Sequence, residues 1–144
     1  MNHLMRIKGG RMVNRSILEN YYKNIKRRNQ LECEIDKLEK SNEHLKKYLN
    51  VYDPVANMEK RIHLNNKLIA DKYIEIDNII KDTSNIEYVI NNLTDEERKI
   101  SKLRFDKKKE YISISREMNM SQSTVCRRVR EILLKIAGVE QNIN

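Results

Sequence analysis

Apolar residues in the middle of the chain recur at helical spacing and predict a long amphipathic helix. From Leu31 to Leu49 they alternate at intervals of three and four, the a/d pattern of a coiled coil. The positions of this seam are Leu31, Ile35, Leu38, Asn42, Leu45 and Leu49. Leu18, Tyr21 and Ile25 extend the pattern less regularly upstream. Asn42 is polar, and such a residue can fix the register of a helix pair, mark a bend or lie at the surface.

A second long helix is predicted after a short connection. Asp53 can cap it, and Pro54 suits the first helical position, which needs no N–H donor. Its inward positions are predicted to be Ile62, Ile69, Tyr73, Ile76, either Ile79 or Ile80, and Ile90. The polar run at residues 81–85 is a candidate for a break or bend. Because the connection is short, the two helices are expected to form an antiparallel hairpin.

The last third of the chain has the pattern of a helix-turn-helix. Ile114 and Met118 lie four apart on a first helix. Apolar residues recur on a second helix at Val125, Val129, Ile132, Leu133 and Ile136. Asn119 stands between the helices, where a sharp corner needs a left-handed residue and Asn is the choice after Gly. Ser121 can then cap the second helix by accepting a bond from the N–H of residue 123 or 124.

The candidate DNA contacts are polar residues on and before this second helix. With the valines turned inward, Gln122, Ser123 and Arg127 lie near its exposed N-terminal face, the part that enters a major groove. Gln suits adenine, and Arg suits guanine or phosphate. Arg128 and Arg130 are expected to contact the DNA backbone. The full predicted set is Gln122, Ser123, Thr124, Arg127, Arg128 and Arg130, with Lys107, Lys108 and Lys109 as phosphate contacts. The competing interpretation is a solvated basic face on a core helix, which the upstream turn makes less favoured.

The segment before the turn carries a resemblance to a known family. Thr94 and Glu97 have the spacing of a capping box, which begins a helix with Ile100, Leu103 and Phe105 turned inward. The sequence then runs LTDEERKISKLRF, DKKKE and YISISREMNMSQSTV, and it resembles region 4 of bacterial sigma factors. Together with a helical N-terminal half, it is similar to small phage regulators of the RinA and ArpU type, which activate late genes.

The resemblance also has limits and implications. Ser115 replaces the usual Ala, Asn119 replaces the usual Gly, and the loop is a lysine cluster. Promoter melting by sigma factors uses aromatic residues, and this chain has no Trp and one Phe, so a self-sufficient initiation factor is not expected. By resemblance, the helix from Thr94 to Phe105 and the basic C-terminal helix would contact the flap of bacterial RNA polymerase.

Composition narrows the function classes further. The 144 residues carry a formal net charge of +8, concentrated in residues 1–28 and 93–137, as polyanion binding predicts. For the cluster Lys26-Arg27-Arg28, a solvated helix face and a second DNA contact are equally favoured. Two cysteines and three histidines lack zinc-ligand spacing. No catalytic motif, metal or cofactor site is recognised, so no enzyme is expected. No apolar stretch approaches a membrane span or a signal peptide, which favours the cytoplasm of a bacterial host.

These patterns together predict an all-α protein with a long antiparallel, coiled-coil-like hairpin followed by a small region 4-like helix-turn-helix domain. The expected segments are a flexible N-terminus (1–10), the hairpin for oligomerisation or docking (11–92), the DNA-binding domain (93–137) and a flexible C-terminus (138–144). The expected function is a sequence-specific double-stranded-DNA-binding transcription regulator, a phage or prophage activator acting with host RNA polymerase. A homodimer is expected, because one hairpin buries little apolar area and two-fold symmetry matches paired half-sites. The alternatives are a phage small terminase subunit, which would form a ring, and a coiled-coil adaptor or anti-sigma-like protein.

Overall fold

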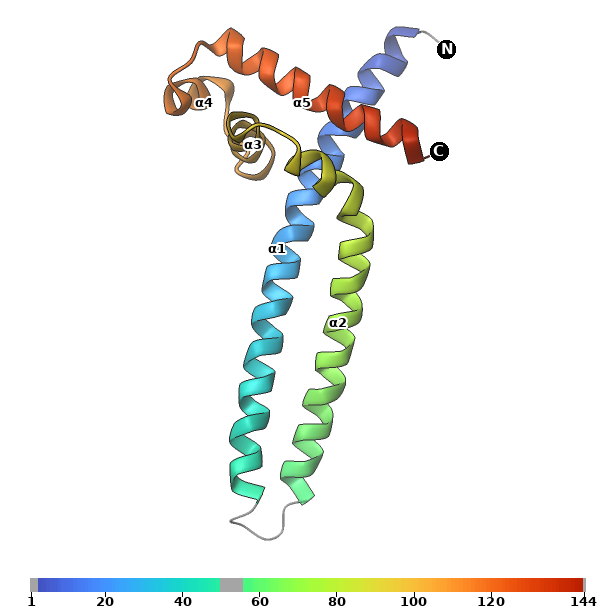
Figure 1. The fold of residues 1–144 in the computed structure, drawn as a ribbon, viewed down its shortest axis with the longest axis vertical. Helices are drawn as coiled ribbons and strands as arrows, with labels where there is room; N and C mark the ends of the chain where they lie inside the picture. Colours follow the sequence, from blue (N-terminus) through green and yellow to red (C-terminus); the bar gives the residue numbers. More distant parts are fainter. Residues whose placement is uncertain (1–2, 50–55, 144) are drawn as a thin grey trace. The chain divides into compact units, whose positions relative to one another are not determined.

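The chain is all-helical, as predicted. The computed structural model describes the backbone of residues 3–49 and 56–143, and the side chains of residues 14–48 and 57–138. A long helical hairpin is followed by three shorter helices, which confirms the predicted fold class (Figure 1). The elements are α1 (His3–Leu49), α2 (Ala56–Asn91), α3 (Asp95–Ser101), a π-helical turn η1 (Lys102–Asp106), α4 (Tyr111–Met118) and α5 (Gln122–Ile143). The predicted cap by Asp53 and Pro54 lies outside the described residues.

Contacts divide the chain into two compact units, and Ile25–Asp82 forms the hairpin unit. In it the two helices run antiparallel and side by side (Figure 1). Leu31 and Ile35 of α1 bury against Ile76 and Ile79 of α2, and Ile69 packs beside them. This contact confirms the intramolecular use of the predicted seam, because helices with a 3–4 repeat bury the a and d positions against each other.

Asn42 lies in this seam and is buried at 6% exposure. Its amide nitrogen donates to the Asn66 Oδ1 at 2.9 Å, and its Oδ1 accepts from Asn65 Nδ2 at 2.9 Å. Asn65 also donates to the hydroxyl of Ser41 at 3.5 Å. A buried amide without partners would cost about 1–3 kcal/mol, so this polar layer favours the one register in which the three Asn residues meet. Of the three predicted roles for Asn42, a surface position is ruled out by its burial, and the cross-helix bonds to Asn65 and Asn66 favour a role in fixing the register.

Two expectations for α2 are wrong. Tyr73 was predicted to face inward, but it is 49% exposed. The seam passes instead through Lys72, whose ammonium reaches the Glu34 carboxylate at 2.8 Å, so the position next to it turns outward. The candidate break at residues 81–85 is absent, because α2 continues to Asn91 and Thr83 is buried inside it. Of the two candidates at the next turn, Ile79 is buried and Ile80 is 43% exposed.

The second unit joins segments that are distant in sequence, Met1–Asn24 and Thr83–Asn144. The Tyr22 hydroxyl bonds to the buried hydroxyl of Ser101 at 2.8 Å, and Asn14 donates to the carbonyl of Leu133 at 3.4 Å. The boundary predicted from the sequence lies at residues 92/93, where the hairpin pattern ends and the region 4-like segment begins. The contact-based units divide the chain elsewhere, at 24/25 and 82/83. Of the predicted flexible ends, residues 3–10 lie within α1 and residues 138–143 within α5.

α3 begins with the predicted capping box. The Glu97 N–H donates to the Thr94 hydroxyl at 3.1 Å, and the Thr94 N–H donates to the Glu97 carboxylate at 3.1 Å. Ile100, Leu103 and Phe105 are buried, as expected. The helix widens into η1, which ends with the Lys107 N–H bonded to the Lys102 carbonyl, an i→i+5 bond.

Among the described residues, no helix is long and apolar enough to span a membrane.

Candidate DNA interface

The corner between α4 and α5 is built on Asn119. Its backbone is left-handed, with φ 53° and ψ 47°, as predicted from its position. The N–H groups of Asn119 and Met120 both point back to the Ser115 carbonyl, the latter at 3.0 Å. A bond from the residue after the left-handed one to a carbonyl five residues back is the signature of a Schellman motif. The corner therefore ends α4 and supplies donors to the Ser115 carbonyl without a glycine.

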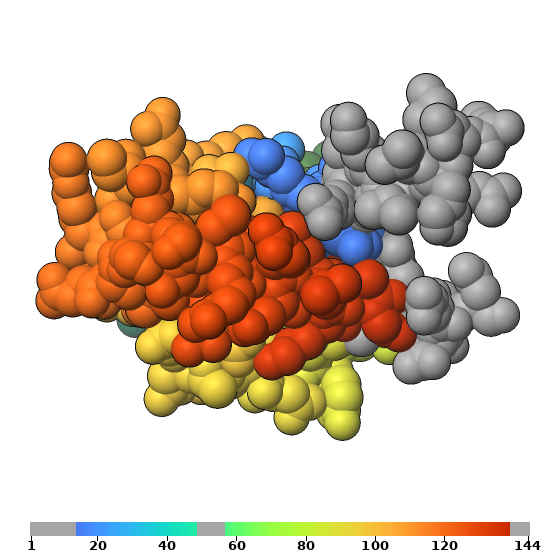
Figure 2. Space-filling model, turned by 90° about the horizontal axis from the view of Figure 1, so that it is seen from above, coloured from blue at the N-terminus to red at the C-terminus, as the bar shows by residue number. Residues whose placement is uncertain are grey.

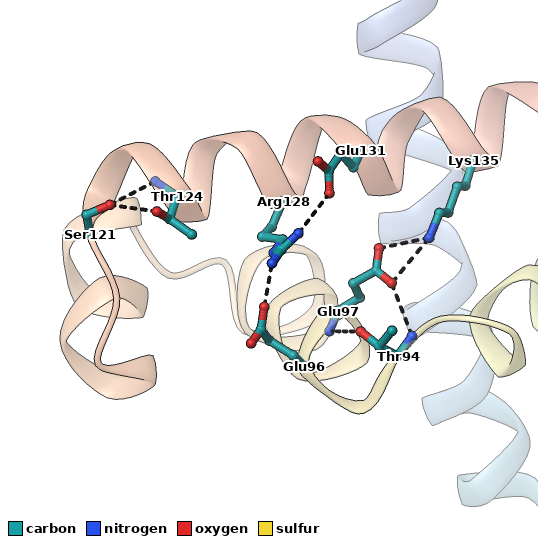
Figure 3. A network of polar contacts seen from close by, with 8 residues as sticks. All are labelled: Thr94, Glu96, Glu97, Ser121, Thr124, Arg128, Glu131 and Lys135. Carbon is teal, nitrogen blue, oxygen red and sulfur yellow. Dashed lines mark hydrogen bonds and ion pairs between the residues drawn. The ribbon is translucent and has the colours of Figure 1, made fainter.

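Ser121 starts α5, also as predicted. The Thr124 N–H donates to the Ser121 hydroxyl at 3.2 Å. The hydroxyls of Ser121 and Thr124 bond to each other at 2.7 Å, and Ser123 lies 3.1 Å from the same oxygen. Figure 3 shows Thr124 turned back toward Ser121. The hydroxyls of Thr124 and Ser123, both predicted DNA contacts, therefore bond to the cap residue, but Ser123 is exposed whereas Thr124 is half-buried, so Ser123 is the better candidate for base contact.

The two sides of α5 differ sharply in burial. Val125, Val129, Ile132 and Ile136 are buried, each at 3% exposure or less. Gln122, Ser123, Arg127 and Arg130 are exposed. In Figure 2 the surface of α5, orange to red, lies open on the face shown. The first turns of α5 thus present an amide, a hydroxyl and a guanidinium outward, the donor and acceptor types that read base edges.

Arg127 and Arg128 are adjacent in sequence but have different surroundings. The Arg128 Nε lies 3.0 Å from a Glu96 carboxylate oxygen, and its Nη1 lies 3.3 Å from Glu131. Hydrogen bonds to Glu131 and then Glu96 raise the pKa of the Arg128 guanidinium. Figure 3 shows this side chain reaching from α5 to α3. Arg127 makes no comparable ion pair within the described part of the chain, so its charge is available to a ligand.

Arg130 borders a hollow in the same unit. Tyr111 and Cys126 line the hollow beside it, and Leu134, which is 66% exposed, lies at the next turn. The guanidinium of Arg130 is thus flanked by apolar surface as well as solvent.

The lysine loop before α4 has a defined backbone. Lys108 adopts φ 55°, a left-handed conformation that the sequence did not predict. The Lys109 N–H donates to the Leu103 carbonyl at 3.0 Å, and the Lys109 carbonyl accepts from Arg104 at 2.9 Å. The Arg104 guanidinium also lies 4.3 Å from the centre of the Tyr111 ring, a cation–π contact. Arg104 was missed in the sequence because its partners are backbone and ring atoms across the loop.

The three loop lysines are not equivalent. Lys107 and Lys108 are exposed, whereas Lys109 is half-buried. The Lys109 ammonium lies 3.0 Å from the Glu117 carboxylate on the last turn of α4. Glu117 was not singled out from the sequence, since a separation of eight residues crosses the loop and follows no helical spacing.

Glu97 connects the start of α3 to α5. Its carboxylate receives the Lys135 ammonium at 3.0 and 3.2 Å, in addition to the capping bonds (Figure 3). Burial raises the pKa of Glu97, but hydrogen bonds from Lys135 and Thr94 outweigh burial and leave the pKa lowered. The carboxylate is therefore ionised at neutral pH and holds two elements together.

The basic cluster Lys26-Arg27-Arg28 lies on α1, inside the hairpin unit. Arg27 binds Glu75 of α2 through two nitrogens, at 2.9 and 3.2 Å. That pairing supports the structural interpretation for Arg27 over a second DNA contact, because a bidentate carboxylate already takes up its guanidinium.

Comparison with known proteins identifies the family. Residues 12–138 match the model of a family described as protein of unknown function (DUF722), and the chain belongs to that family. No curated protein and no solved structure matches the chain.

Proposed function

We propose that this member of the DUF722 family is a sequence-specific regulator of transcription that binds double-stranded DNA through α4, the Asn119 corner and α5. The observation that carries the proposal is that corner, a left-handed Asn followed by a capped helix with an exposed polar start. In a helix-turn-helix the second helix enters the major groove with its N-terminal residues against the bases. Gln122, Ser123 and Arg127 are the proposed base-reading residues.

The remaining predicted contacts have supporting roles in the proposal. Lys107 and Lys108 lie exposed on the loop before α4, where they can neutralise phosphates. Arg130 binds the DNA backbone farther along α5. Arg128 holds α5 against α3 through Glu96 and contributes to DNA binding by orienting the helix.

The resemblance of residues 93–136 to sigma region 4 extends the proposal to a partner. The capping box and the buried Ile100, Leu103 and Phe105, which were predicted from residue spacing, lie within the segment that carries the resemblance and agree with a helix there. We infer that the protein acts with bacterial RNA polymerase, in the manner of the small phage activators of the RinA and ArpU type, in the cytoplasm of the host.

The proposal is tested by footprinting on the DNA around the protein's own gene, with and without RNA polymerase. A protected site that becomes stronger or longer with polymerase is the expected result. Binding that fails at low salt would reject DNA recognition and favour the adaptor. A ring of many subunits, seen by sedimentation of the full chain, would favour the small terminase subunit.

A homodimer is part of the proposal, but its interface cannot be the apolar seam of the hairpin. Leu31, Ile35, Ile76 and Ile79 are already buried within one hairpin, so the regular seam is not available to a second copy. Sedimentation equilibrium of the full chain is expected to give twice the chain mass of 17.3 kDa. A single species at the chain mass would contradict a dimer without affecting the proposal for DNA.

A further inference from the structure

Glu117 lies where the loop lysines gather, at the end of α4 and beside the corner. Its carboxylate accepts from the Lys109 ammonium at 3.0 Å. The side chains remain 41% and 40% exposed, so both reach solvent and a ligand could approach either. A carboxylate in this place is a negative charge inside a surface proposed to bind a polyanion.

The fold holds Lys109 in place independently of Glu117. Its N–H and carbonyl are both bonded, to Leu103 and Arg104 respectively. Arg104 is itself fixed against the ring of Tyr111. Because the backbone on both sides of the Lys109 Cα is anchored, its ammonium stays in the same region when its partner changes.

Two further lysines act on the same carboxylate. The hydrogen bond from Lys109 lowers the pKa of Glu117; desolvation opposes it, and the charges of Lys109, Lys99 and Lys107 add to the lowering. Lys99 comes from α3 and the other two from the loop. The carboxylate is therefore paired with Lys109 and also attracted by the charges of Lys99 and Lys107, and a phosphate in the same place would be attracted by the same lysines.

We propose that Glu117 competes with DNA for Lys109: its carboxylate occupies the place beside the ammonium that a DNA phosphate would take, and the ion pair stays closed in most wild-type complexes. The inference rests on the proposed function and deepens it, because it makes the loop lysines unequal. Lys108 is ready for a phosphate, whereas Lys109 contributes only when its ion pair opens. Since phosphates are the same in every sequence, the competition weakens binding to all DNA alike and limits the time spent on non-specific sites.

Salt titration of duplex binding tests this competition with Glu117→Gln, Lys109→Gln, the double variant and wild type. Glu117→Gln is expected to bind any duplex about two- to fivefold more tightly at low salt, the range of an exposed ion pair. Its log–log salt slope should steepen by about one, since one more lysine meets a phosphate. Lys109→Gln should keep nearly the wild-type slope, and the double variant should match Lys109→Gln. By contrast, Lys108→Gln should make the slope shallower by about one.

Glu110→Gln is the matched control. It removes the same charge at the opposite end of α4, at the exposed N-cap position, where the side chain makes no cap bond. It should strengthen binding less and leave the slope unchanged. Equal effects of Glu117→Gln and Glu110→Gln, or an unchanged slope for Glu117→Gln, would overturn the competition while wild-type binding upholds the proposed function. If wild type binds no duplex at low salt, the proposed function and this inference both fail. Circular dichroism of each variant checks that the helices remain folded.

Discussion

The left-handed backbone of Asn119 predicts which of two substitutions, Val or Gly, destabilises the protein more at this position. With φ at 53°, a side chain branched at Cβ is forced close to the neighbouring carbonyl. Asn119→Val is therefore expected to destabilise the protein by about 1–2 kcal/mol. Asn119→Gly should be neutral or slightly stabilising, because glycine adopts this conformation without a Cβ clash and its extra unfolded-state entropy offsets part of the gain.

Asn78 provides a control with the same chemistry in ordinary helix. It is exposed in the middle of α2, where Val and Asn have similar helix propensities. Asn78→Val should change stability little, and Asn78→Gly should cost a few tenths of a kcal/mol. The order of the two substitutions thus reverses between the sites. At the corner Gly is better than Val, and in the helix Val is better than Gly.

Thermal melting followed by circular dichroism measures all four variants. For a chain of about this size, 1 kcal/mol corresponds to about 2–4 °C in Tm, so Asn119→Val should melt about 2–8 °C below wild type. Guanidinium titration gives the same order as free energies of unfolding. Equal stability of Asn119→Val and Asn119→Gly, or the same order at both sites, would show that backbone strain does not define this corner.

Three further predictions concern base reading, acid stability and register. Arg127→Ala should lose about 1–3 kcal/mol on the preferred duplex and less on a scrambled one, and equal losses by fluorescence anisotropy would rule out base reading by this residue. Because the pKa of Glu97 is lowered in the fold, its ionised form stabilises the protein above about pH 4 and the benefit is lost as pH falls through the folded value. Wild type should therefore be more stable than Glu97→Gln at neutral pH, with the gap closing in acid, and a pH-independent gap in denaturant titrations would refute the ion pair's role. Asn42→Leu should leave stability unchanged or raised while broadening hairpin resonances in NMR spectra, since apolar contacts alone select register weakly; sharp, single resonances would argue against the polar layer.

Periodicity predicted the hairpin well because helix packing follows spacing along the chain. In the alternation from Leu31 to Leu45, Leu31, Ile35, Asn42 and Leu45 are buried and Leu38 is half-buried. Periodicity failed at Tyr73, because only apolar residues were considered as inward positions and Lys72 was therefore not considered. A lysine can occupy a seam position when its stem packs and its ammonium finds a carboxylate, here Glu34. That partner lies 38 residues away, and nothing in local spacing selects it.

The corner and the caps were predictable for the same reason. Asn119, Ser121 and the Thr94 capping box act within a few residues of themselves, so residue type and position determine their geometry. Lys108 was not predicted to be left-handed, because lysine has no preference for that region. Its conformation comes from the bonds that hold Lys109 on the next residue.

The count of basic residues is larger than the number available to contact DNA, because some of them are paired with carboxylates. Lys109 and Arg128, both predicted as DNA contacts, are bound to Glu117 and to Glu96 with Glu131. In each such pair a carboxylate of the protein neutralises the basic side chain. That side chain can displace a counterion from a DNA phosphate only after it leaves the carboxylate. The net charge of +8 counts these cations and their carboxylates without regard to position. The proposed interface therefore depends on which basic residues lack an ion-pair partner within the described part of the chain. On α5, Arg127 has no such partner and is proposed to contact bases, whereas Arg128 is paired with Glu96 and Glu131 and holds the helix in place.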